Sequence, residues 1–130
     1  MNPLALDTNA YRAMEDGNQK LADRLRASSS IGLPVIVLGE LWAGFFGGSK
    51  VEENTGRLQR FLSTPRVELL DITDKTARLF GEVAATLRQA GKPIQQDDIW
   101  IAALCKQYGY VLATADVGFG NIPGLEVFTF

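Results

Sequence analysis

Histidine is absent from this 130-residue sequence, and cysteine occurs once. The lack of histidine excludes Ser-His-Asp and Cys-His hydrolytic arrangements and the usual histidine zinc sites. The single thiol, Cys105, can form no internal disulfide, and its apolar neighbours are typical of a buried, unreactive side chain. Proton transfer near neutral pH would therefore fall to carboxylates, lysine, tyrosine or a water activated by a metal ion.

Long apolar runs are also missing. No stretch approaches the ~20 residues needed to span a bilayer, and Met1–Leu6 lacks the basic start of a signal peptide. We therefore expect a cytoplasmic protein with no membrane segment. A hydrophobic content of 46% predicts one globular domain over residues 1–130. The net charge of −2 gives no bulk attraction for nucleic acid, so such a partner would need a local basic patch or bound cations.

Short apolar runs alternate with helical patterns along the chain. Strands are predicted at 4–6, 35–38, 67–70 and 110–114, with an alternating edge strand at 125–130 and a turn at 32–34. Helices are predicted at about 11–15, 18–27, 39–46, 50–62, 74–90 and 99–108. Strands separated by helices indicate an α/β domain with a mainly parallel central sheet of four to five strands, flanked by helices.

Acidic residues follow three of these predicted strands. Asp7 comes directly after the first strand, and Glu40 comes two residues after the second. Asp116 comes two residues after the strand that ends at Thr114. Ligands bind beyond the carboxyl ends of the strands in open α/β sheets, so these three acids should lie at one edge.

A fourth acid is expected to reach this edge from the first turn of the 99–108 helix. Asp98 shares a helix face with the apolar Ile101 and Ala102, whereas Asp97 lies about 100° further around the helix. Negative charge is favourable at a helix start, which explains one acid but not two in succession. Asp98 is therefore the better candidate, although each of these acids also has a simpler explanation as a cap or turn residue.

Four converging carboxylates would repel one another and raise their own pKa values. Divalent cations relieve this repulsion, and hard ions such as Mg²⁺ or Mn²⁺ prefer oxygen ligands. Such ions lower the pKa of a bound water and shield a phosphate during attack. This chemistry requires no histidine.

Five runs of the sequence form a recognisable series: Leu6–Asn9, Leu38–Gly44, Pro93–Ala103, Thr114–Phe119 and Ile122–Leu125. In this order they resemble the PIN-domain family, and particularly its VapC-type toxins from prokaryotic toxin–antitoxin pairs. The likeness covers nearly the whole chain. The resemblance implies a PIN-like fold and an endoribonuclease that uses Mg²⁺ or Mn²⁺. Its implied catalytic residues and metal ligands are Asp7, Glu40, Asp98 and Asp116. It also implies an RNA substrate, a homodimer and a cognate antitoxin that occupies the active-site groove.

The resemblance also assigns supporting residues and shows two departures. Asn9 and Thr114 match positions that support the acids by hydrogen bonds. Asp97 stands where the family often has Asn, which makes it both a supporting residue and a rival ligand to Asp98. Val117 and Gly118 stand where many relatives carry a basic side chain, so RNA contacts at that point are in doubt.

Two other functions fit parts of the pattern. A phosphotransfer domain, such as a receiver or a dehalogenase-like phosphatase, also has acids at strand ends. The phosphatase pattern requires a second Asp two residues after the first, where this chain has Asn9. A degenerate PIN-fold scaffold that binds RNA or protein without catalysis is the other alternative, and the presence of all four acids argues against it.

Overall fold

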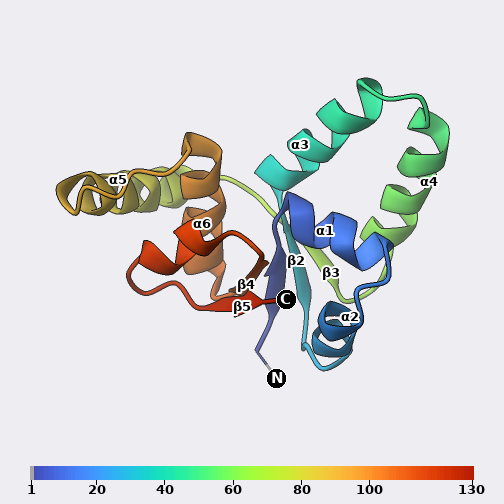
Figure 1. Ribbon diagram of the computed structural model, residues 1–130, viewed down its shortest axis with the longest axis horizontal. Helices are drawn as coiled ribbons and strands as arrows, with labels where there is room; N and C mark the ends of the chain where they lie inside the picture. The colour runs from blue at the N-terminus through green and yellow to red at the C-terminus, as the bar shows by residue number, and fades with distance from the viewer. Residues whose placement is uncertain (1) are drawn as a thin grey trace.

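A five-stranded parallel sheet in the order β3-β2-β1-β4-β5 organises the computed structural model, which describes residues 2–130 (Figure 1). The strands are β1 (Leu4–Leu6), β2 (Ile31–Pro34), β3 (Val67–Leu70), β4 (Val111–Thr114) and β5 (Val127–Thr129). The helices are α1 (Thr8–Glu15), α2 (Gln19–Arg26), α3 (Val35–Phe46), α4 (Val51–Leu62), α5 (Asp74–Gln89) and α6 (Gln96–Tyr108), with a 3₁₀ helix η1 (Val117–Asn121). The predicted α/β class, the parallel sheet and the flanking helices are confirmed.

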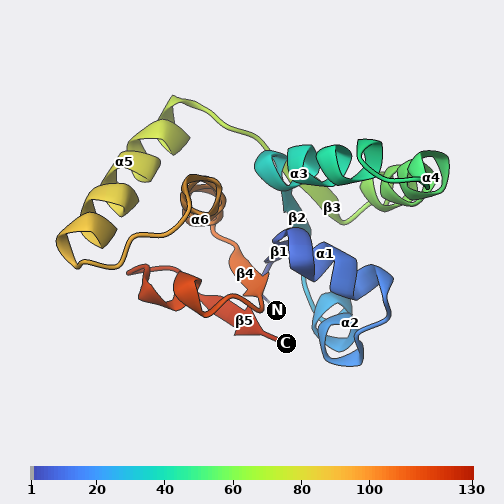
Figure 2. The same cartoon turned by 45° about the horizontal axis from the view of Figure 1, so that its top comes forward.

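The helices cover the sheet from both sides. Figures 1 and 2 show α5 and α6 on one side and α1 and α2 on the other, while α3 extends away from the end of β2 and α4 returns beside it. Every residue of β1, β2 and β4 is buried, as expected for strands enclosed by helices. None of the helices within residues 2–130 is long and apolar enough to cross a membrane.

The predicted strand at 35–38 is wrong. The second strand is β2 (Ile31–Pro34), which includes the predicted turn, and Val35 begins α3. A short apolar run fits a buried strand and a buried helix equally well, so periodicity could not separate them. Pro34 is tolerated here because it is the last residue of β2, where it pairs with Leu70 at the end of β3. The fixed φ of proline also suits the residue that precedes a helix. As a consequence, Glu40 lies within α3 rather than just beyond a strand.

Other boundaries moved by a few residues. Thr73, not Asp74, caps α5, and its side chain and that of Thr76 form a reciprocal capping box. The helix predicted to begin at Ile99 begins at Gln96, which places Asp97 and Asp98 inside its first turn. Gly109 ends α6 in the left-handed conformation, with φ of 75°, as a C-terminal cap glycine should.

The strand order creates a switch point between β1 and β4. The chain runs from β1 to β2 and β3 on one side, then crosses to β4 and β5 on the other. Leu6 pairs with Ala113, and the Asp7 N–H donates to the Ala113 carbonyl at 3.4 Å, so the two strands end together. Open α/β sheets bind ligands beyond the strand ends at such a point.

Gly32 lies at a tightly packed position of β2, against the side chains of Tyr110 and Leu70. A Cβ at this position would lie 2.8 Å from Tyr110 Cε2 and 2.9 Å from Leu70 Cδ1. We expect Gly32→Ala to lower the free energy of unfolding by about 1–3 kcal/mol, because a packed core must shift to admit a methyl group. Gly81→Ala, at an exposed α5 position with open space, should instead raise it by about 0.5–1 kcal/mol. Urea denaturation measures both, and equal effects would contradict the packing assigned to Gly32.

Candidate metal centre

Asp7 and Asp116 lie at the carboxyl ends of the two strands that flank the switch point. Asp7 caps α1, where its Oδ1 accepts a hydrogen bond from the Ala10 N–H at 2.8 Å. Asp116 caps η1, and its Oδ1 accepts from the Gly118 N–H at 2.8 Å. In each carboxylate one oxygen is fixed by the backbone, which leaves the other oxygen for a further ligand.

Thr114, the last residue of β4, supports both acids. Its buried hydroxyl accepts a hydrogen bond from the Asp116 N–H at 2.9 Å. Burial raises the pKa of Asp7, and nearby Asp116 raises it further, while hydrogen bonds from Thr114 and the Ala10 N–H oppose the rise. Thr114 therefore helps to keep Asp7 ionised in a buried position.

Glu40 reaches the same edge from α3. The Thr8 hydroxyl, at the start of α1, donates a hydrogen bond to Glu40 Oε1 at 2.7 Å. Thr8 directly follows Asp7, so this contact ties Glu40 to the end of β1. Thr8 was not among the residues singled out from the sequence. Its position between two predicted site residues, in the run Leu6–Asn9, was the available signal.

Asp98 completes the edge from the first turn of α6 and is half-buried. Burial raises its pKa to about 6, and the charges of Asp116, Glu40 and Asp7 add to the effect in that order. Asp97 is exposed and contributes least to this shift. The charges of all three other candidate acids therefore help to raise the pKa of Asp98.

Asn9 is exposed on α1, and no hydrogen bond joins it to an acid within residues 2–130. Asp98 and Asp116 together line a pocket of about 300 Å³ whose walls include Ile94 and Phe119. Within the described chain, however, no three acidic or cysteine side chains are close enough to form a complete metal cage. The acids therefore lie at one edge of the sheet, and their charges act on Asp98, but their side chains do not form a complete set of metal ligands.

Comparisons with known proteins identify the family of the chain. The family model described as "PIN domain" matches residues 4–125. Ribonuclease VapC2 of Rickettsia felis is 32% identical over 125 residues, covering 92% of both chains. Ribonuclease VapC5 of Mycobacterium tuberculosis is 27% identical over 119 residues, covering 92% of this chain and 87% of its own.

Solved structures show the same likeness in three dimensions. The complex named VapBC2 from Rickettsia felis, bound to a promoter DNA fragment, contains a chain that matches with a TM-score of 0.87 at 28% identity and 98% coverage of both chains. A chain of VapBC-1 from nontypeable Haemophilus influenzae matches with a TM-score of 0.85 at 26% identity, over 98% of this chain and 97% of its own.

A parallel α/β domain with acids gathered at its switch point defines the class, and the chain belongs to the PIN-domain family. Within that family, it is a homologue of the VapC ribonuclease toxins of toxin–antitoxin systems.

The raised pKa of Asp98 predicts a specific pH dependence. Because the folded pKa of about 6 exceeds the ordinary value of 3.8, the native state gains stability from Asp98 below about pH 4 and loses it as pH rises through 6. Asp98→Asn removes this dependence. We expect the variant, in EDTA at pH 7.5, to unfold with a free energy about 1 kcal/mol higher than wild type, a value reduced for solvent screening.

Urea denaturation of wild type and Asp98→Asn between pH 4 and 8 measures this difference. The gap between the two should grow as pH rises and should be absent at pH 4. A constant gap across this range would mean that the fold does not raise the pKa of Asp98.

Proposed function

We propose that this protein is a metal-dependent endoribonuclease that hydrolyses RNA phosphodiester bonds and acts as the toxin of a toxin–antitoxin pair. The observation that carries the proposal is the placement of four acids at the switch point: β1 and β4 end together before Asp7 and Asp116, Asp98 lines a pocket with Asp116, and Thr8 ties Glu40 to the end of β1. Membership of the PIN-domain family and similarity to named ribonucleases support it. A scaffold without catalysis would gain nothing from four like charges placed close together at this edge.

The donor set fits Mg²⁺ or Mn²⁺. All four proposed ligands, Asp7, Glu40, Asp98 and Asp116, offer hard carboxylate oxygens. None of them is paired with a lysine or arginine in the part of the chain described, where the ion pairs lie on α2, α4 and α5. Mg²⁺ commonly keeps several waters, so an incomplete protein cage is compatible with it.

When bound, such a cation would neutralise the crowded carboxylates and activate a water near the RNA phosphate. The protein's own contribution is orientation. Thr8 holds Glu40 through its 2.7 Å hydrogen bond, and the Gly118 N–H holds one oxygen of Asp116. Thr114 stabilises the ionised form of Asp7. These contacts fix the carboxylates before substrate arrives, which lowers the cost of assembling the site.

We also propose a cognate antitoxin and a homodimer as partners. The antitoxin is supported by the similar chains in VapBC complexes from Rickettsia felis and Haemophilus influenzae. The homodimer rests on the family resemblance, and an exposed aromatic side chain on α3 is compatible with it: Phe46 is 68% exposed and stacks on the partly buried Trp42.

Substitution of the neighbouring acids on α6 tests the catalytic assignment. We expect Asp98→Asn to reduce Mg²⁺-dependent RNA cleavage by more than about a hundredfold, because outer positioning residues alone typically cost 10–100-fold. Asp97→Asn, its matched control, should retain cleavage within a few fold, since Asp97 is exposed and acts weakly on Asp98. The measurement is the initial rate on total RNA with Mg²⁺ or EDTA, with 5′ ends mapped.

Two results would contradict the proposal. Cleavage that persists in EDTA would remove the metal from the reaction. Full activity in Asp98→Asn with loss in Asp97→Asn would show that Asp97 is the ligand and that the geometry around Asp98 serves another purpose.

A further inference from the structure

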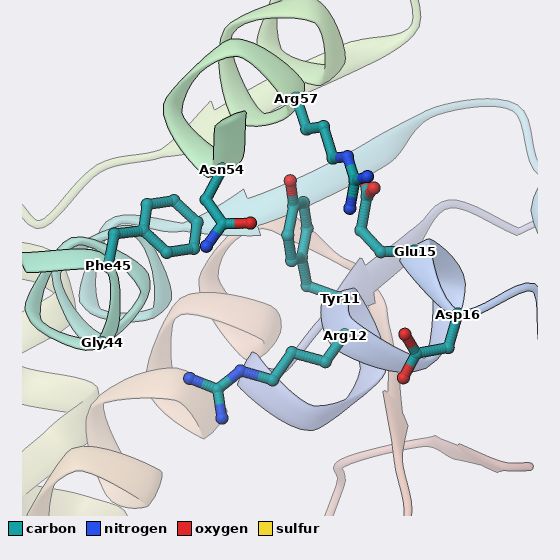
Figure 3. Close-up of a pocket in the computed structure, with 8 residues that line it drawn as sticks. All are labelled: Tyr11, Arg12, Glu15, Asp16, Gly44, Phe45, Asn54 and Arg57. Atoms are coloured by element: carbon teal, nitrogen blue, oxygen red, sulfur yellow. The ribbon is translucent and has the colours of Figure 1, made fainter. Parts of the chain in front are cut away.

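A second pocket, of about 300 Å³, opens between α1, α3 and α4 (Figure 3). Two of these helices, α1 and α3, also position acids of the candidate metal centre, and the pocket lies next to that centre along both of them. Tyr11 comes four residues after Asp7 on α1, and Gly44 comes four residues after Glu40 on α3. Four residues are about one helical turn, a rise of about 5.4 Å. The pocket is therefore one turn beyond the acids on both helices.

The side chains in this pocket offer hydrogen bonds and flat faces. Figure 3 shows Arg12 from α1, Phe45 from α3 and Asn54 from α4 converging on it. Gly44 makes room for the Arg12 guanidinium, because a Cβ there would lie 2.9 Å from Arg12 Nη2. Within residues 2–130, neither the Arg12 guanidinium nor the Asn54 amide has a side-chain hydrogen bond or ion pair.

The Tyr11 side chain forms the inner wall, and its hydroxyl lies near the Glu15 carboxylate without a well-formed hydrogen bond to it. The residue is 3% exposed, and its hydroxyl is the only buried side-chain polar atom without a hydrogen bond in the described residues. Figure 3 shows this hydroxyl between Asn54 and Arg57. Burial, with the charge of Glu15, raises the pKa of Tyr11, so the group stays protonated and can donate. A ligand acceptor in the pocket would give this buried hydroxyl a hydrogen bond of good geometry.

The charged residues that line the pocket favour a neutral ligand. Two guanidinium groups, of Arg12 and Arg57, and two carboxylates, of Glu15 and Asp16, line the pocket, and Arg57 is also paired with Glu53 at 2.8 Å. The positive charges are therefore balanced, and a phosphate would meet as many carboxylates as guanidinium groups. A neutral, flat group with hydrogen-bonding edges suits the pocket better, because it can stack on Phe45 and pair with the Asn54 amide.

We propose that this pocket binds one unpaired nucleobase of the RNA substrate, adjacent to the phosphate held at the acids. The proposal rests on the proposed ribonuclease function and adds a determinant of sequence preference to it. The base stacks against Phe45 and the Arg12 guanidinium. Its edge pairs with Asn54 and accepts a hydrogen bond from Tyr11. The substrate is thus RNA that presents a single-stranded or bulged base beside the cleavage site.

The test compares binding of intact and abasic RNA. The probes are a single-stranded pentaribonucleotide of mixed sequence and five versions, each lacking the base at one position. Binding is measured by fluorescence anisotropy in Mg²⁺ on the Asp98→Asn chain, with RNA integrity checked on gels. We expect loss of one particular base to weaken binding about fivefold or more, as expected for one stacked base.

Pocket variants complete the cycle. With Asn54→Ala or Phe45→Leu added, the intact RNA should bind as weakly as that abasic probe, and the abasic probe should lose nothing further. Gln59→Ala, which removes an exposed amide from the same helix outside the pocket, should leave the base dependence intact. Circular dichroism melting confirms that each variant is folded.

Three outcomes would overturn the subsite. The abasic probes could all bind like the intact RNA, or base dependence could survive in both pocket variants. Alternatively, the variants could leave RNA binding unchanged and weaken only the complex with the antitoxin, which would make the pocket a protein-docking site. Failure of the ribonuclease function is distinct, because it would appear as no Mg²⁺-dependent cleavage by wild type while base-dependent binding persisted.

Discussion

Repulsion between carboxylates is the constraint on which the rest of the structure depends. Parallel pairing of β1 with β4 brings Asp7 and Asp116 to the same edge, and Glu40 and Asp98 are added from α3 and α6. The chain provides no lysine or arginine partner for these acids within the described residues. The fold instead holds Asp7, Glu40 and Asp116 with backbone N–H groups and a threonine hydroxyl, which orient these three carboxylates without neutralising them.

That arrangement would allow an acidic chain without histidine to act on the polyanionic substrate proposed for it. The positive charge would come from cations at the edge, and the adjacent pocket adds contacts that do not depend on net charge. Arg12 and Arg57 are balanced there by Glu15 and Asp16, so base stacking rather than phosphate attraction would position the RNA. The two sites are one helical turn apart on both α1 and α3, so one substrate strand would reach both.

The sequence predicted the class of fold and the approximate place of the acids, because strand-end acids obey a rule that depends only on strand order. The prediction was wrong where a short apolar run fits both a buried strand and a buried helix. Val35–Leu38 is helix rather than strand, so Glu40 was assigned to the right edge for the wrong reason. The Thr8 contact with Glu40 depends on the packing of α1 against α3, and the surroundings of the Tyr11 hydroxyl depend on the packing of α1 against α4. No local pattern encodes either contact.

The central claim is that these acids bind a divalent cation, and calorimetric titration of Mn²⁺ into the metal-free protein tests it most directly. We expect wild type to bind Mn²⁺ saturably in the micromolar to millimolar range, and Asp98→Asn to bind at least about tenfold more weakly. Asp97→Asn should bind like wild type. Absence of Mn²⁺ binding by the wild-type chain, or equal binding by Asp98→Asn, would contradict the metal centre.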